Sequence, residues 1–151
     1  MHLILWRHAE AVDGAPDLER ELTRKGYKQA RKMAAWLNQQ LPSRVRVIAS
    51  PAERAQQTAH ALTEKFDVVS SIAPGASPTA ILKAANWPDA RQSVVLVGHQ
   101  PTLGEAAALI LSGIALPLSI KKGGIWWLTH RVRDGRPQVL LRAVMSPEML
   151  T

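Results

Sequence analysis

Short runs of consecutive apolar residues alternate along this chain with longer segments in which apolar residues recur every three or four positions. The runs predict strands at residues 2–8, 45–50 and 93–99. The third run is β-branched and apolar throughout, as is typical of a strand covered on both faces. The periodic segments predict helices at 24–41, 51–66, 78–86 and 102–113. Two more strands, 124–132 and 138–145, flank a turn.

Residue types that favour helix ends mark several of these boundaries. Thr23 is placed to cap the first helix, Ser50 reads as the N-cap of the second, and Gly113 ends the fourth. Within the second helix, Gln57 and Thr58 are expected to pack or to hydrogen-bond locally. One face of the first helix is small and apolar and is expected to pack on the core: Gly26, Ala30, Met33, Ala34 and Leu37.

Strands that alternate with helices are typical of α/β folds with a parallel sheet. We therefore expect a three-layer α/β/α sandwich with a mostly parallel central sheet, in which the last two strands pair antiparallel. No internal repeat, low-complexity tract or linker interrupts the pattern. Residues 1–151 are accordingly expected to form a single domain.

Composition narrows the class of protein. The absence of cysteine excludes disulfides and thiolate metal sites and fits a reducing compartment. Arg7 interrupts the first apolar run too early for a signal peptide, and no segment reaches the roughly 18 apolar residues of a membrane span. We expect a cytoplasmic protein with no membrane partner.

The formal net charge is +7, and the Lys and Arg residues are densest at 20–32 and 120–124. A basic surface suits nucleic acids or anionic substrates. The sequence contains no nucleic-acid-binding signature, and Tyr27 is the only aromatic residue inside the first basic group. We therefore favour a solvated surface that attracts anions and expect no nucleic-acid partner.

The ends of the three predicted parallel strands carry candidate functional residues. Arg7 and His8 end the first strand, Arg54 lies one turn into the helix after the second, and His99 ends the third. In open α/β sheets, ligands bind beyond these strand ends, where helix N-termini also favour anions. A single arginine there is usually a surface ion pair, and a single histidine usually has a structural role. Four such residues together favour a phosphate site, with catalysis left open.

Four segments resemble the histidine phosphatase superfamily, also called phosphoglycerate-mutase-like, in the family's order and spacing: LWRHAEA, LTRKGYKQARKMAAWL, VIASPAERAQQTA and VVLVGHQPTLGEAA. The short chain, the MAAWL helix and the closing VMSPEML look like the small bacterial SixA-type phosphohistidine phosphatases. The resemblance covers residues 2–112 and extends more loosely beyond them. It implies the phosphoglycerate-mutase-like fold.

The resemblance also implies a role for each candidate. His8 matches the nucleophile that forms a phosphohistidine intermediate, and Arg7 and Arg54 match the arginines that clamp the phosphoryl oxygens. His99 matches a hydrogen-bond donor to the same group. The chemistry agrees, because a nucleophilic histidine must be neutral at the attacking nitrogen and nearby arginines lower its pKa. The same cations stabilise a transferring phosphoryl group, so we expect neither a metal nor another cofactor.

Two departures from the family pattern bear on the substrate. Ala9 stands where glycine is commonest, and a small side chain is expected to suffice there. Residues 68–88 lack the acidic proton donor that the family's mutases and acid phosphatases carry. An alkoxide leaving group needs that proton, whereas an imidazole departs already protonated. The absence of this acid therefore favours phosphohistidine over phosphate esters as the substrate.

The remaining acids that could donate this proton, which we call the fallback acids, are Glu10, Asp13, Glu53 and Glu105. For Glu10 we favour a structural role. We predict a metal-independent phosphatase that uses His8 to remove phosphate from phosphohistidine on a protein partner, such as a histidine phosphotransfer domain. One alternative changes the substrate to a small phosphorylated metabolite or nucleotide. The other is a non-catalytic module that binds phosphate or phosphohistidine.

Overall fold

The computed structural model describes residues 1–151, and one six-stranded sheet organises them, in the order β3-β2-β4-β1-β5-β6. The strands β3, β2, β4 and β1 pair in parallel, and β5 pairs antiparallel with both β1 and β6. The strand bounds are β1 His2–Arg7, β2 Val45–Ala49, β3 Asp67–Val68, β4 Ser93–Gly98, β5 Ile125–Arg133 and β6 Arg136–Met145. The predicted α/β fold with a mostly parallel sheet is confirmed.

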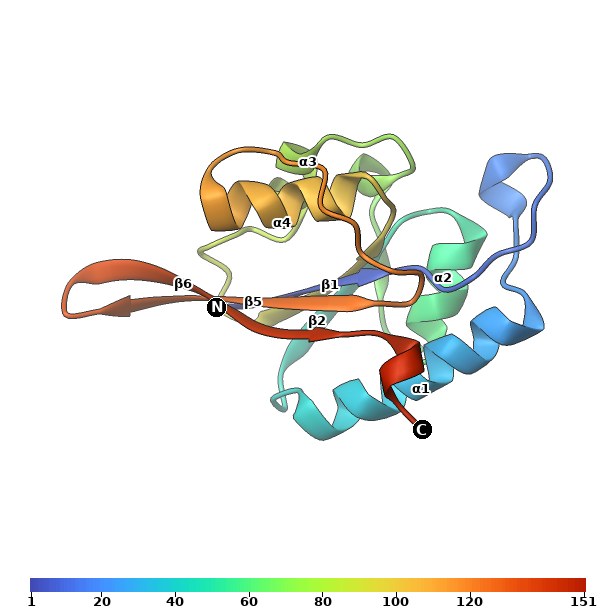
Figure 1. Cartoon of the computed structure of the whole chain (residues 1–151), viewed down its shortest axis with the longest axis horizontal. Coiled ribbons are helices and arrows are strands. Elements are labelled where there is room, and N and C mark those ends of the chain that lie inside the picture. The colour runs from blue at the N-terminus through green and yellow to red at the C-terminus, as the bar shows by residue number, and fades with distance from the viewer.

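Helices cover both faces of this sheet (Figure 1). Helices α1 (Arg24–Gln40) and α2 (Glu53–His60) lie on one face, and α3 (Pro78–Ala84) and α4 (Thr102–Ser112) lie on the other. Three short 3-10 turns complete the chain: η1 Asp17–Glu19, η2 Ser70–Ile72 and η3 Pro147–Met149. None of the helices has the length and apolar character that crossing a membrane requires.

Alternate side chains of the central strands fill the two sides of the sandwich. In β1, Ile4 and Trp6 join the core on the side of α1 and α2, whereas Leu3 and Leu5 join the core on the side of α3 and α4. Strand β4 is buried along its whole length, as its sequence predicts. The face of α1 predicted to pack on the core is buried at every position: Gly26, Ala30, Met33, Ala34 and Leu37.

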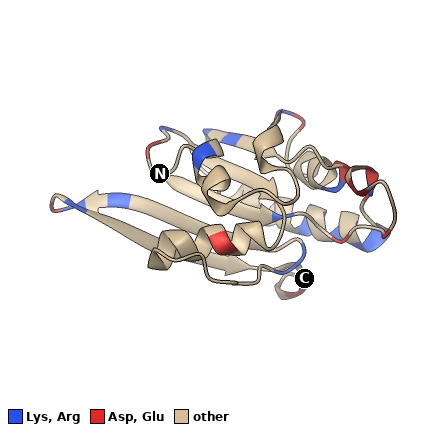
Figure 2. Cartoon of the chain, turned by 90° about the horizontal axis from the view of Figure 1, so that it is seen from above, with Lys and Arg blue, Asp and Glu red and all other residues tan.

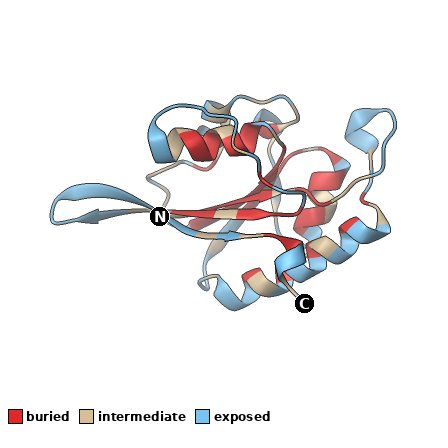
Figure 3. Ribbon diagram, in the orientation of Figure 1, coloured by how far each residue is buried: buried red, intermediate tan, exposed pale blue.

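The hairpin of β5 and β6 extends past the helical layers at the end of the molecule away from α2 (Figure 1). Lys and Arg residues are spread over the chain, the tip of this hairpin included (Figure 2). Strand β6 is exposed along most of its length (Figure 3). The tip is therefore remote from the buried centre of the sheet.

Some predicted boundaries are wrong. The second helix ends at His60, because the chain then turns back so that Leu62 and Phe66 pack on the core. Its N-cap is Ala52, so Ser50 does not cap it. Strand β5 lies one residue later than predicted and β6 begins two residues earlier, because residues 134 and 135 alone form the turn, with φ of 54° and 74°. The predicted ends at Thr23, whose side chain accepts from the backbone of residue 26, and at Gly113, with φ of 80°, are confirmed.

Candidate active site

The C-terminal ends of β1 and β4 and the start of α2 bring the four predicted site residues together. They line a cavity of about 250 Å³. Segments that follow β1, β3 and α4 complete its wall. The lining residues are Arg7, His8, Ala11, Asp13, Arg20, Arg54, Pro74, His99, Gln100 and Lys122.

His8 is held as a neutral imidazole with its lone pair on Nε2. Its Nδ1 lies 2.8 Å from the carbonyl oxygen of Ala9, which can only accept a hydrogen bond, so Nδ1 carries the proton. Burial, together with the charges of Arg54, Arg7 and Arg20, lowers the pKa of His8 to about 4. The expected effect of the arginines has the right direction, but burial contributes more.

The guanidinium groups of Arg7 and Arg54 are anchored through their terminal nitrogens. Arg7 Nη1 donates to the carbonyl oxygen of Ile120 at 2.8 Å. Arg54 donates from Nη1 to the backbone oxygen of Asp17 at 2.8 Å and from Nη2 to its Oδ2 at 3.2 Å. The Nε atoms of both arginines are buried and make no hydrogen bond. A buried donor without an acceptor is costly, so these two N–H groups suit the oxygens of an anionic ligand.

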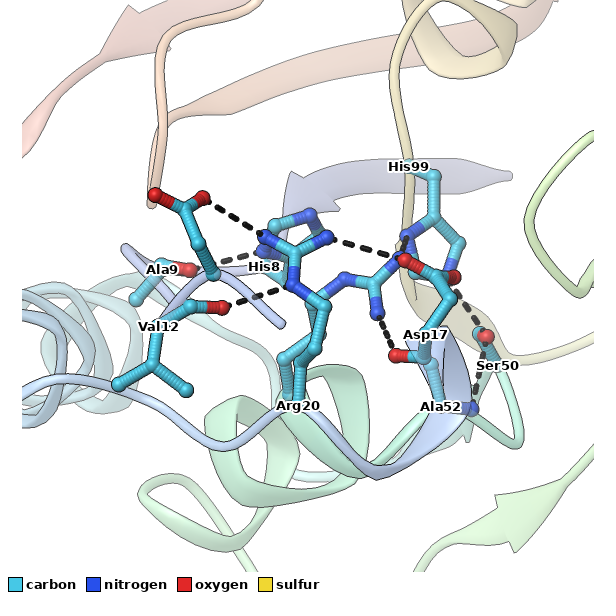
Figure 4. A network of polar contacts seen from close by, with 10 residues as sticks. His8, Ala9, Val12, Asp17, Arg20, Ser50, Ala52 and His99 are labelled. Atoms are coloured by element: carbon cyan, nitrogen blue, oxygen red, sulfur yellow. Dashed lines mark hydrogen bonds and ion pairs between the residues drawn. The ribbon is translucent and has the colours of Figure 1, made fainter. Parts of the chain in front are cut away.

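Asp17 also joins a third arginine to the site (Figure 4). Its Oδ1 accepts from Arg20 Nη1 at 3.0 Å, and Arg20 Nε donates to the carbonyl oxygen of Val12 at 2.7 Å. The hydrogen bonds from Arg20 and Arg54 lower the pKa of Asp17, so its carboxylate stays ionised. The sequence does not mark Asp17 or Arg20 as site residues, because they lie in a polar loop in which only the turn residues predict any structure.

Ser50 and Arg54 hold the ring of His99. Ser50 is fully buried, and its Oγ accepts from the backbone N–H of Ala52 at 3.1 Å. The same hydroxyl forms a hydrogen bond with His99 Nε2 at 2.7 Å. His99 Nδ1 lies 3.5 Å from Arg54 Nη2, which can only donate a hydrogen bond. Both ring nitrogens therefore have polar partners, which fix the orientation of the ring.

The charge state of His99 follows from its surroundings. Burial, together with the neighbouring His8 and Arg54, lowers the pKa of His99 to about 3. Both rings of the histidine pair, whose centroids lie 5.1 Å apart, are therefore neutral at pH 7.

The backbone after His8 is fixed by α2 and α1. The N–H of Ala9 donates to Thr58 Oγ1 at 3.0 Å, and Thr58 in turn donates to the carbonyl oxygen of Arg54. Ala9 is fully buried and its φ is not positive, so a small side chain suffices there, as expected. Thr58, expected to bond only within its helix, also holds the backbone next to His8.

Among the fallback acids, Asp13 alone lines the cavity. Glu10 accepts from Thr23 Oγ1 at 2.7 Å, which is the structural role favoured for it. Glu53 accepts from Gln57 within α2, and Glu105 on α4 does not line the cavity. No group of three or more His, Cys, Asp and Glu side chains is placed to hold a metal ion.

Residues 118–124 form a strap bound to the end of β1. The backbone N–H of Arg7 donates to Gly124 O at 3.0 Å, and that of Gly123 donates to His8 O at 3.1 Å. The side chain of Gln100 donates to the carbonyl oxygen of residue 118 at 3.0 Å. The strap thereby orients Arg7 through Ile120 and places Lys122 at the cavity.

Comparisons with known proteins agree with this geometry. A sequence profile described as the histidine phosphatase superfamily (branch 1) matches residues 3–75. The chain is 31% identical to the phosphohistidine phosphatase SixA homolog of Haemophilus influenzae, in an alignment that covers 97% of each chain. It is also 31% identical to the phosphohistidine phosphatase SixA of Escherichia coli, over 78% of this chain and 79% of that one. The solved structure of the protein histidine phosphatase SixA complexed with tungstate superposes with a TM-score of 0.77, 26% identity and 99% coverage of both chains.

Proposed function

This chain belongs to the histidine phosphatase superfamily, and from that premise we propose that it removes phosphate from phosphohistidine on a protein partner, with His8 as nucleophile. The observation that carries the proposal is the pair of buried, unpartnered Nε donors of Arg7 and Arg54 beside a neutral His8. This combination supports a site that binds an oxyanion next to a nitrogen lone pair. The similar SixA structure is complexed with tungstate, which is also a tetrahedral oxyanion.

The proposed reaction has two steps. In the first, His8 Nε2 attacks phosphorus and the bond between phosphorus and the substrate imidazole breaks. That imidazole is already protonated on its other ring nitrogen and leaves as a neutral ring. In the second, water attacks the phosphorylated His8, the new P–N bond breaks, and inorganic phosphate leaves with the proton of the water. The Nε groups of Arg7 and Arg54 would donate to the phosphoryl oxygens, which carry the developing charge, and His99 would contact the same group.

The cavity favours a phosphorylated side chain over a large free metabolite. Its volume of about 250 Å³ lies below the roughly 300–1,000 Å³ of pockets that enclose drug-sized ligands. Its lining is almost entirely polar and contains no Phe, Tyr or Trp side chain on which a nucleobase could stack. These features suit a small group presented by a larger molecule. The names of the two SixA relatives support phosphohistidine as that group.

The carboxylates around the cavity bear on the leaving group. Asp13 is fully exposed and lies 4.0 Å from Arg20, and no other carboxylate lines the cavity. This arrangement supports a substrate whose leaving group needs little acid assistance.

The test is phosphate release from a phosphohistidine peptide and from a phosphoserine peptide of otherwise identical sequence. We expect release from the phosphohistidine peptide alone, loss of at least 1,000-fold in His8→Ala, about the size of effect that removing a catalytic group produces, and no loss in Asp13→Asn. The control is His60→Ala, because His60 is exposed at the end of α2. Preferred release from phosphoserine that is lost in Asp13→Asn would contradict the proposal. Tight phosphate binding without turnover would point to the non-catalytic alternative.

A further inference from the structure

Helix α1 carries five cations and no acidic residue. Their spacing places them on one side of the helix, opposite the buried face, and all five are exposed. None of them takes part in an ion pair. We call this surface the α1 basic face: Arg24, Lys25, Lys28, Arg31 and Lys32.

This arrangement works against the stability of the helix. Arg24 and Lys25 occupy the first turn, where the positive end of the helix dipole disfavours cations. Lys28 lies four residues from both Arg24 and Lys32, and like charges at this spacing repel each other. The one polar contact of these cations within the chain is the hydrogen bond from Lys32 Nζ to the carbonyl oxygen of Leu150 at 3.1 Å. A ligand of opposite charge would remove the repulsion.

The α1 basic face is continuous with the rim of the cavity. Gln29, which lies between its lysines, accepts from the backbone N–H of Glu10, two residues after His8, at 3.0 Å. Gly123 lies against the same side chain, because a Cβ on Gly123 would be 3.5 Å from Gln29 Cβ. The neighbouring Lys122 lines the cavity. An anionic surface that covers this face would therefore also reach the rim.

Lys122 extends the same charge to the cavity itself. Its neighbour Lys121 is paired with Glu148, whereas Lys122 forms no ion pair. Arg20 adds a cation on the other part of the rim. Positive charge thus runs from α1 to the cavity mouth.

We propose that the α1 basic face docks an acidic surface of the phosphorylated protein whose side chain enters the cavity. This inference rests on the proposed function, because it names the surface that would recruit the substrate of that site. A protein fits better than a nucleic acid, because the cavity takes one small group and its lining contains no Phe, Tyr or Trp side chain for a base to stack on. Charge complementarity of this kind raises the association rate and falls with salt.

The test compares two triple variants with the same net charge. Arg24→Glu/Lys25→Glu/Lys28→Glu alters the α1 basic face, and Arg131→Glu/Arg133→Glu/Arg136→Glu alters the exposed hairpin at the other end of the molecule. Each changes the formal charge by −6, from +7 to +1. Substrates are a phosphohistidine peptide flanked by glutamates, the same peptide with glutamines instead, and free phosphohistidine.

We expect the wild type and the hairpin variant to prefer the glutamate peptide over the glutamine peptide by about tenfold in kcat/KM at low salt. The α1 variant should lose this preference and still hydrolyse free phosphohistidine within about twofold of the wild-type rate, because it leaves the cavity lining unchanged. Thermal unfolding should show that the α1 variant is folded and at least as stable as wild type, since glutamate is favourable in a first helical turn. An unchanged preference in the α1 variant, or an equal loss in the hairpin variant, would overturn the inference.

Binding separates this inference from the proposed function. If the wild type hydrolyses no phosphohistidine substrate, the proposed function fails. Fluorescence anisotropy with the unphosphorylated glutamate peptide then still tests the face: binding that the α1 variant alone loses supports docking, and no binding overturns it. Binding of a short DNA duplex in preference to this peptide, lost in the same variant, would also overturn the inference and assign the face to nucleic acid.

Discussion

Asp17 holds Arg54 by the end of its guanidinium group and leaves the Nε side free. Both terminal nitrogens of Arg54 donate to this one residue, Nη1 to its backbone oxygen at 2.8 Å and Nη2 to its carboxylate at 3.2 Å. Because the group is planar and rigid, fixing one edge also fixes the direction of the Nε–H. Asp17 is therefore a positioning residue for a donor that the site needs.

Replacing Asp17 should weaken catalysis without removing it. We expect Asp17→Ala to lower kcat/KM for a phosphohistidine peptide about tenfold, and Asp17→Asn to lower it less. A charge-assisted hydrogen bond contributes about 1.5–3 kcal/mol, and here exposure of the carboxylate reduces that value. Glu19→Ala, in the same 3-10 turn, is the control. An equal loss in the control would show that the turn, and not the contact with Arg54, matters.

Ser50 should act on catalysis through His99. Ser50→Ala removes the hydroxyl that holds His99 Nε2, and we expect kcat to fall about tenfold, the effect of roughly 1.4 kcal/mol. The double variant with His99→Ala should be no worse than His99→Ala alone, because the two residues act as one unit. Additive losses in the double variant would argue against this coupling.

The pH profile of the reaction should reflect two unusually acidic histidines. With pKa values of about 4 for His8 and about 3 for His99, both stay neutral well below pH 6.5. We expect kcat/KM for free phosphohistidine to hold between pH 7 and 5 and to fall near pH 4, as His8 Nε2 takes up a proton. Initial rates across this range are the measurement, corrected for uncatalysed hydrolysis. A midpoint near 6.5 would mean that His8 titrates like a solvent-exposed histidine.

Stability should depend on pH for the same reason. Between the ordinary value of 6.5 and the lowered values, the unfolded chain binds protons that the folded chain does not. The free energy of unfolding therefore falls as the pH drops from about 7 towards 4. Urea unfolding at pH 7 and pH 5 measures this slope, and His99→Asn should make it shallower. A slope unaffected by that substitution would remove His99 as a source of acid sensitivity.

Thr58 should matter for stability because it satisfies a buried donor. Thr58→Val leaves the N–H of Ala9 without an acceptor, and we expect a loss of about 1–3 kcal/mol in the free energy of unfolding. Thr58→Ser keeps the hydroxyl and should lose less. Activity should fall further in Thr58→Val than in Thr58→Ser, because the carbonyl oxygen of Ala9 holds Nδ1 of His8. A larger loss in Thr58→Ser than in Thr58→Val would mean that packing of the methyl group matters more than the hydrogen bond.

The sequence predicts those parts of the fold in which a local pattern and burial coincide. The buried face of α1 and the wholly apolar β4 have clear periodicities, and both are confirmed. The end of α2 could not be predicted in this way, because residues 61–66 continue a helical pattern. There the packing of Leu62 and Phe66 against the core decides where the chain turns.

The residues of the candidate site also differ in whether a local sequence pattern predicts them. Arg7, His8, Arg54 and His99 stand at predicted strand or helix ends, so the topology alone brings them to one rim. Asp17 has no such signal, since its partner Arg54 is 37 residues away and the segment between β1 and α1 that holds Asp17 has no regular pattern. The fallback acids Glu10 and Glu105 were considered for their residue type, and only the fold shows that neither lines the cavity.

Because the strap joins the cavity to the end of β1, the cavity can bind an anion only in the folded chain. Arg7 reaches Ile120 across 113 residues, and Arg54 reaches His99 across 45, so the donors come together only when the whole sheet has formed. The unfolded chain holds no such arrangement, and an anion that occupies the cavity therefore stabilises the native state alone, by RT ln(1 + [L]/Kd). A rise in melting temperature with phosphate or tungstate concentration would consequently give the affinity of the site without any substrate or turnover. The same titration would distinguish variants that no longer bind the anion from variants that bind it and no longer catalyse the reaction.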